Sequence, residues 1–338
     1  MGSSASPTTP AASREFLAIF RAQADSAGAM TFARFMALAL YDPAVGYYRR
    51  DRHRIGYGPG TDFFTASTSG SIFGELIAAA CVTLLGERDP RAFTFVEIGA
   101  EPPDAAEPTS GGGVLAGVAH PFGAVRTVAV GEPIELAGPC VVFSNELFDA
   151  QPFHRFVFRG GAWRELGVAL RDGVLATVEL SAATPAPLPA TAPEGYVIDA
   201  PLAAADLAKH IAAQPWTGLF LACDYGKSWR ELTEAAPAGT ARAYFRHTQS
   251  NDLLIRPGEQ DLTCHVCWDW LAEALARRGF ASPAVESQEA FFIHHAADLI
   301  AVISAAEAAR FSRKKLALLQ LLHPAHLGQK FQVLHASR

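Results

Sequence analysis

The stretch "EIGAEPPDAAEPTSGGGV", from Glu97 to Val114, contains the turn that decides the fold. It continues an apolar run, Phe93–Ile98, that predicts a buried strand. Gly99 follows and permits the positive φ that a close turn after a strand requires. A buried strand ending in a glycine turn is typical of α/β proteins that hold a nucleotide-like cofactor at that turn.

The same stretch then departs from that pattern. Glu101-Pro102-Pro103 stands where further glycines are expected, and proline has no N–H to offer a ligand. Gly111, Gly112 and Gly113 come later. If Pro103–Ser110 is an insertion, the remainder reads "EIGAEPGGGVLAGV", which is again rich in glycine. Two hypotheses stay open: a working site with an insertion, or a site that has lost its ligand.

The remaining chain supports an α/β fold. Further buried strands are predicted at Val125–Val130, Val141–Ser144 and Thr217–Ala222, with helices such as Ser69–Leu85, Pro201–Ala213 and Leu299–Leu322 among them. This alternation predicts a mainly parallel, doubly wound sheet. The stretch Phe153–Leu180 alternates polar and apolar residues between glycine turns, so we expect a β-rich insertion of hairpins.

Three regions are expected along the chain. Residues 1–13 form a disordered tail, residues 14–90 an N-terminal helical and substrate-loop region, and residues 91–338 the α/β domain, with its hairpin insertion at about 153–195. The chain has 338 residues, half of them apolar, which is enough for a sizeable core.

Charge and composition exclude some classes of function. The net charge of −6 argues against general nucleic-acid binding. No apolar run reaches the ~18 residues needed to span a membrane. The five cysteines suit a reducing, cytoplasmic compartment. Cys264 and Cys267 form a single CxxC pair without a second pair, so we expect no metal site; the role of the pair stays open.

Nine short stretches resemble, in the same order, one family: the MidA-type S-adenosylmethionine (SAM)-dependent methyltransferases, which include a mitochondrial complex I assembly arginine methyltransferase and bacterial relatives. They cover most of the chain. The matching stretches are "GYY" (46–48), "TDFFTAS" (61–67), "FGELIA" (73–78), "EIGA" (97–100), "SNELFDAQPFHRF" (144–156), "DYG" (224–226), "GTARAYFRH" (239–247), "PGEQDLTCHV" (257–266) and "LGQKFQVL" (327–334).

The resemblance implies a class I methyltransferase fold, SAM as cofactor and methylation of a protein, with arginine as the implied acceptor. The implied partner is a protein substrate such as a subunit of respiratory complex I; we expect no nucleic acid and no membrane span, and a homodimer is left open. An acid after the second strand would hold the ribose, and Glu132 is the candidate. The helix that normally joins the first two strands is expected to be reduced or lost.

The expected site residues fall into three groups. Carboxylates would hold a guanidinium acceptor and localise its charge. These catalytic candidates are Glu146, Asp149 and Asp62. The candidates for cofactor binding are Glu97, Gly99, Ala100, Gly111, Gly112, Asn145 and Glu132. The candidates for substrate binding are Tyr47, Tyr48, Phe63, Asp224, Tyr225, His247, Asp261 and His265.

Two hypotheses about function follow. In the first, the chain is a SAM-dependent methyltransferase acting on a protein. In the second, it is a binding or assembly protein with a methyltransferase fold that has lost SAM. A nucleotide-binding oxidoreductase is set aside, because the first strand is not followed by G-x-G-x-x-G.

Overall fold

The computed structural model describes residues 12–50, 62, 70–100, 112–307 and 312–338. The chain folds into two compact units that interleave in sequence. We call Met1–Arg52, Gln151–Leu202 and Leu232–Cys264 the antiparallel unit, and His53–Ala150, Ala203–Glu231 and His265–Arg338 the mixed-sheet unit.

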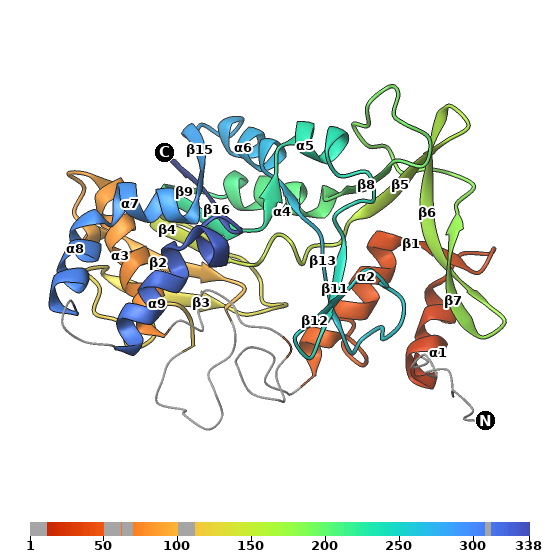
Figure 1. Cartoon of the computed structure of the whole chain (residues 1–338), viewed down its shortest axis with the longest axis horizontal. Coiled ribbons are helices and arrows are strands. Elements are labelled where there is room, and N and C mark those ends of the chain that lie inside the picture. Colours follow the sequence, from red (N-terminus) through yellow and green to blue (C-terminus); the bar gives the residue numbers. More distant parts are fainter. Residues whose placement is uncertain (1–11, 51–61, 63–69, 101–111, 308–311) are drawn as a thin grey trace. The chain divides into compact units, whose positions relative to one another are not determined.

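The mixed-sheet unit is built on six strands in the order β15-β16-β9-β4-β2-β3 (Figure 1). Neighbours among β2, β3, β4 and β9 are parallel, whereas β16 is antiparallel to both β9 and β15. The strands are β2 (Thr94–Ile98), β3 (Ala124–Val128), β4 (Gly138–Asn145), β9 (Trp216–Asp224), β15 (Ala281–Ser287) and β16 (Gln332–Ser337). The predicted mainly parallel sheet is therefore confirmed, with β16 as the reversed strand.

Both faces of this sheet are covered, because alternate residues of each strand enter different cores. Phe95 and Phe143 belong to the core on one face, with helices α3 (Ser71–Leu85), α7 (Gln288–His295), α8 (Ala297–Ala306) and α9 (Arg313–Leu322). Val96 and Val142 belong to the core on the other face, with α4 (Leu202–Ala213) and α6 (Trp268–Ala276). This two-sided burial is the doubly wound arrangement that near-continuous apolar strands predict.

The order of the strands locates the ligand-binding edge. After β2 the chain crosses to β3 on one side, and β4 then pairs with β2 on the other side. In open α/β sheets, ligands bind beyond the carboxyl ends of the strands where the chain reverses its direction of winding. Here that point lies between the ends of β2 and β4, at Gly99 and Asn145.

The antiparallel unit contains the predicted hairpins. Strands β5 (His154–Arg159), β6 (Ala162–Arg171) and β7 (Val174–Glu179) pair in sequence, and β8 (Val197–Ala200) adds to β5. The N-terminal β1 (Ala29–Thr31) pairs with β6 and joins helices α1 (Arg14–Gln23) and α2 (Phe32–Tyr41) to this sheet. A second sheet contains β11 (Arg242–Phe245), β12 (Thr248–Ser250) and β13 (Asp261–Thr263).

Short elements complete the described chain. They are the single-turn helices η1 (Tyr47–Arg49), η3 (Pro90–Ala92) and η4 (Pro324–Gly328), the helix α5 (Trp229–Glu234), and the paired strands β10 (Gly226–Lys227) and β14 (Val266–Cys267). In the described part of the chain no single helix has the length and apolarity to cross a membrane; α7 and α8, bent by 90° at their junction, meet that test only together.

Two expectations about elements can be compared with the structure. The described residues between β2 and β3, 112–123, form turns, bends and irregular chain with no helix; that the helix of this connection is reduced or lost stays a prediction, because residues 101–111 lie outside the described part. The continuous helix predicted over Leu299–Leu322 is wrong, because α8 ends at Ala306 and α9 begins only after Ser312. Ser312 has an extended backbone, and its hydroxyl accepts a hydrogen bond from the Lys315 N–H, which starts a separate helix.

Candidate functional site

The turn after β2 depends on Gly99. Its φ is +80°, and its N–H donates to the Val128 carbonyl of the neighbouring strand at 2.8 Å. A Cβ at this position would lie 2.9 Å from Cδ1 of Leu147, in the turn after β4. Glycine is therefore required here for two reasons. It permits the left-handed backbone, and it leaves room for Leu147 in the turn after β4. Ala100 follows and is buried.

Glu97 holds the other end of the glycine loop against β2. Its carboxylate accepts a hydrogen bond of 2.6 Å from the Val114 N–H. Gly113 has a φ of +102°, and a Cβ there would lie 2.6 Å from Oε2 of Glu97. Burial raises the pKa of Glu97 to about 7, although the hydrogen bond from Val114 opposes that rise. Glu97 thus positions the loop at Gly113 and Val114.

The interrupted part of the loop lies outside the described residues, which include neither Gly111 nor Pro103–Ser110. Its two ends are nevertheless both at β2, because Gly99 follows that strand and Val114 binds Glu97 within it. Loops whose ends are held at one place tolerate insertions at little free-energy cost. That Pro103–Ser110 is an insertion remains a prediction.

Helix α3 packs closely against this loop at Val114. Gly74 is buried in the helix, and a Cβ there would lie 2.1 Å from the Val114 carbonyl oxygen. Only glycine lets the helix approach the loop so closely. The stretch "FGELIA" pointed to this helix, but a contact between residues forty positions apart could not be predicted from it.

The turn after β4 has an unusual backbone. Glu146 has a φ of +50°, and its N–H donates to the Cys223 carbonyl at 2.9 Å. The side-chain amide of Asn145 donates to Oε1 of Glu146 at 3.0 Å. A left-handed conformation in a residue other than glycine costs about 1–3 kcal/mol and is concentrated at functional sites.

Asp224, at the end of β9, fixes that turn. Its carboxylate is fully buried; Oδ2 accepts the N–H groups of Phe148 at 2.9 Å and Asp149 at 3.3 Å, and Oδ1 accepts that of Tyr225 at 2.8 Å. Burial raises the pKa of Asp224 to about 7, despite these backbone hydrogen bonds. The geometry makes Asp224 a positioning residue for the segment that carries Glu146 and Asp149. Its predicted contact with substrate remains a prediction.

The other predicted residues of the mixed-sheet unit are placed as follows. Glu132 is exposed after β3, where its carboxylate accepts the Ala129 N–H at 2.8 Å and closes a turn. Asp62 and Asp149 are buried carboxylates. The Tyr225 ring packs against Phe331, with 4.1 Å between the ring centroids. His265 is half-buried between β13 and β14, and Phe63 lies outside the described residues.

The antiparallel unit brings three predicted substrate-binding residues together. The Tyr48 hydroxyl donates to Oδ1 of the buried Asp261 at 2.9 Å, and the ring of Tyr47 packs edge-on against Tyr48 at 5.1 Å. His247 is not part of this group. It lies in the turn between β11 and β12 with a φ of +61°, next to Arg246 at +47°. Two successive residues with positive φ are the signature of a tight hairpin turn.

The edge between β2 and β4 fits a cofactor with hydrogen-bond donors. Oδ1 of Asn145 and Oγ of Ser144 are buried, and neither has a hydrogen-bond partner among the described residues. A buried polar atom without a partner costs about 1–3 kcal/mol, so a ligand is expected to satisfy it. The ammonium and hydroxyl groups of SAM are suitable donors.

The fold and this edge define a class I methyltransferase: a doubly wound sheet with one reversed strand and a glycine turn at the switch point. Comparison with known proteins agrees. The family described as "Putative S-adenosyl-L-methionine-dependent methyltransferase" matches residues 127–285.

Relatives extend the similarity over nearly the whole chain. The Mus musculus protein named "Protein arginine methyltransferase NDUFAF7, mitochondrial" is 25% identical over 374 aligned positions, covering 90% of this chain and 80% of its own. The Rattus norvegicus protein of the same name is 24% identical with the same coverage.

Two solved structures show the same fold, one of them with S-adenosyl-homocysteine bound. A COG1565 superfamily member from Burkholderia thailandensis, crystallised with S-adenosyl-homocysteine, superimposes with a TM-score of 0.82 at 26% identity, covering 96% of this chain and 92% of its own. A native crystal structure of a COG1565 protein from the same organism gives a TM-score of 0.76 at 25% identity, covering 96% and 91%. The chain is thus similar over nearly its whole length to COG1565 methyltransferases, and it is a SAM-dependent methyltransferase with SAM as its cofactor.

Proposed function

We propose that this methyltransferase acts on a protein and that the acceptor is an arginine side chain. The name of the mouse relative, a protein arginine methyltransferase, supports this choice. The observation that carries it is the strained turn of Glu146, where φ is +50° at the switch point of the sheet. A carboxylate held there is suited to a planar cation, because carboxylate and guanidinium form paired, charge-assisted hydrogen bonds.

In this proposal the chain's carboxylates bind and orient the acceptor. Glu146 and Asp149 hold the guanidinium, and Asp62 is the third candidate carboxylate. A guanidinium nitrogen is a weak nucleophile because its lone pair is delocalised, so a carboxylate that orients it and takes its proton raises its reactivity. SAM, when bound, supplies the electrophilic methyl group. Because no bond to the protein forms, the protein contributes mainly position and charge.

We assign cofactor binding to the edge between β2 and β4. The residues proposed to contact the cofactor are Glu97, Gly99, Ala100, Gly111, Gly112 and Asn145, with Glu132 as the candidate for the ribose hydroxyls. In this proposal Oδ1 of Asn145, which lacks a partner among the described residues, accepts a hydrogen bond from the cofactor.

The wider biology is part of the same proposal. The protein substrate is a subunit of respiratory complex I, by analogy with the assembly factor in the resembling family, and Tyr47, Tyr48 and Asp261 contribute to its binding. We place the enzyme in the cytoplasm. A homodimer is the state of association to be tested, by light scattering.

Glu146→Gln is the direct test of the catalytic assignment. It preserves the shape of the side chain and removes its charge, so methyl transfer to arginine-containing protein substrates should fall by about 100-fold. SAM affinity, measured by calorimetry, should change less than about threefold, because the substitution acts on the acceptor.

Glu87→Gln, at an exposed turn after α3, is the matched control and should leave both quantities unchanged. Equal losses of transfer and SAM affinity in Glu146→Gln would contradict its role. An absence of SAM binding in the unaltered protein would instead revive the second hypothesis, a binding protein without cofactor.

A further inference from the structure

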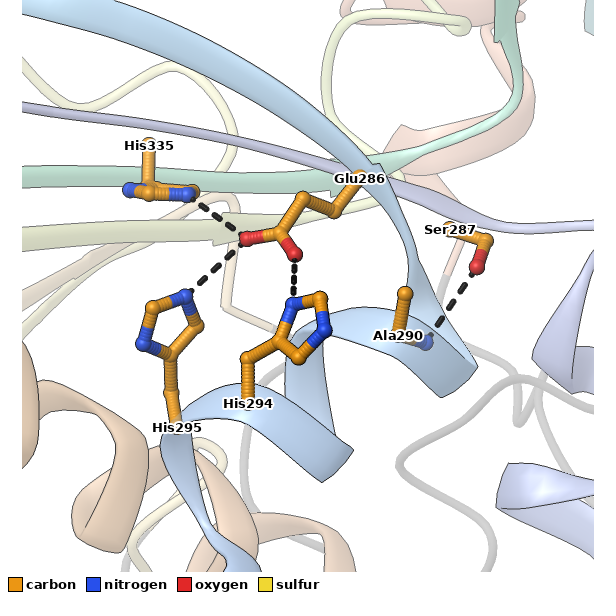
Figure 2. A network of polar contacts seen from close by, with 6 residues as sticks. All are labelled: Glu286, Ser287, Ala290, His294, His295 and His335. Atoms are coloured by element: carbon orange, nitrogen blue, oxygen red, sulfur yellow. Dashed lines mark hydrogen bonds and ion pairs between the residues drawn. The ribbon is translucent and has the colours of Figure 1, made fainter.

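Four polar side chains converge at one edge of the mixed sheet, away from the ends of β2 and β4. Figure 2 shows three imidazoles pointing at the carboxylate of Glu286. Nε2 of His295 and Nε2 of His335 both lie 3.0 Å from Oε1 of Glu286, and Nδ1 of His294 bonds its Oε2. In the described residues, Glu286, His295 and His335 form a group whose ligand atoms all lie within 4.8 Å of one another.

The fold holds this cluster in place. Glu286 of β15 lies opposite Val333 of β16, and His335 lies opposite Ala284, so Glu286 and His335 are diagonal neighbours on the same face of the sheet. Ser287 ends β15 and caps α7, its hydroxyl accepting the Ala290 N–H at 3.2 Å. The last turn of α7 then presents His294 and His295 above the carboxylate (Figure 2).

The partial burial of these side chains favours metal binding over a simple ion pair. Side-chain exposure is 18% for Glu286, 19% for His295 and 14% for His335, against 60% for His294. Imidazole nitrogens and carboxylate oxygens are among the ligands that zinc binds in proteins.

The spacing also fits. Tetrahedral zinc with bonds of about 2.0–2.1 Å separates neighbouring ligand atoms by about 3.3 Å. The two nitrogen-to-oxygen separations of 3.0 Å would need to widen by only a few tenths of an ångström. Such a shift is within reach of side-chain rotation at a partly buried site.

We propose that Glu286, His295 and His335 form a binding site for a divalent transition-metal ion of the zinc class, with a water molecule as the fourth ligand. The ion replaces the hydrogen bonds at Glu286 with coordination bonds and displaces any proton carried on the ligating nitrogens. It ties the β15–β16 pair to the end of α7, which packs against α3. The site is thus a structural clip, separate from methyl transfer.

Tag-free, full-length protein stripped with a chelator provides the test. Zinc should bind at one equivalent per chain, as measured by competition with a chromophoric chelator and by elemental analysis, and should raise the melting temperature. His335→Gln and Glu286→Gln should each weaken zinc affinity by at least about 100-fold, since each removes one of few ligands. Cobalt added in place of zinc should give visible absorption bands of a four-coordinate site.

His326→Gln is the matched control. His323 and His326 are an exposed pair with ring centroids 5.1 Å apart, so they report on adventitious binding by surface histidines. Circular dichroism and melting of the metal-free variants check that each is folded. Zinc affinity that is unchanged in His335→Gln, or lost equally in His326→Gln, would overturn the proposal, as would fewer than about 0.1 equivalents bound by the unaltered protein.

Discussion

At the scale of single residues, two buried carboxylates organise the site by binding backbone rather than substrate. Glu97 accepts a hydrogen bond from the Val114 N–H, and Asp224 accepts hydrogen bonds from the N–H groups of Phe148, Asp149 and Tyr225. Both acids were chosen from the sequence because they follow or end strands. Their partners, and the burial that raises both pKa values to about 7, arise only when distant segments pack together.

Glu97 makes stability depend on pH, in a direction that follows from its pKa. Burial raises the pKa from 4.5 to about 7, so the folded protein binds this proton more tightly than the unfolded chain. The resulting stabilisation is complete below pH 4.5 and is lost as the pH rises through 7. The difference corresponds to about 3 kcal/mol when fully lost.

Glu97→Gln removes this dependence. In chemical denaturation of the protein without cofactor, the free energy of unfolding of the unaltered protein should fall by about 2–3 kcal/mol relative to the variant between pH 5 and pH 8. Gln keeps an oxygen for the Val114 N–H, so the loop is retained. Parallel pH profiles for the two proteins would show that Glu97 does not titrate in this range.

At the scale of elements, α3 shows why local propensity is a poor guide to a functional contact. Glycine lowers helix stability, so Gly74 looks like a weakness in an otherwise apolar helix. Tertiary packing requires glycine at this position, because the Val114 carbonyl occupies the space where a Cβ would lie. The strands were easier to predict, because their apolar runs reflect burial on both faces, whereas the break between α8 and α9 depends on a capping serine within a helical pattern.

Gly74→Ala should therefore destabilise the protein, although alanine has the higher helix propensity. The added methyl group must displace the loop at Val114, so we expect a loss of about 2 kcal/mol of unfolding free energy and at least tenfold weaker SAM binding. Thr83→Ala, at an exposed position of the same helix, provides the comparison and should be neutral or slightly stabilising. Stabilisation by Gly74→Ala would mean that the loop does not need this close approach.

At the scale of the whole molecule, segments distant in sequence complete the two largest sheets. β1 pairs with β6, more than a hundred residues later, and β16 lies between β9 and β15. Arg338 secures the end of β16. Its guanidinium donates to the carbonyls of Trp216, Ala212, Gln214 and Arg278, and it packs over the rings of Trp216 and Phe280.

Arg338→Ala should destabilise the mixed-sheet unit by about 2 kcal/mol, because carbonyls around the start of β9 lose a shared donor. The midpoint of urea denaturation measures this loss. Arg278→Ala, an exposed neighbour whose backbone carbonyl is kept, should change the midpoint little. Equal midpoints for Arg338→Ala and the unaltered protein would show that these bonds are replaced by water without loss.

The sequence by itself determined the α/β class, the buried strands β2, β4 and β9, the hairpins of Phe153–Leu180 and the methyltransferase class, because periodic burial and short ordered motifs are local properties of the chain. Only the tertiary structure decided which carboxylates accept hydrogen bonds from backbone N–H groups and why position 74 requires glycine. It also decided that the side chains of Glu286, His295 and His335 lie together. These depend on strand register and helix packing between residues far apart, and no local pattern specifies such contacts.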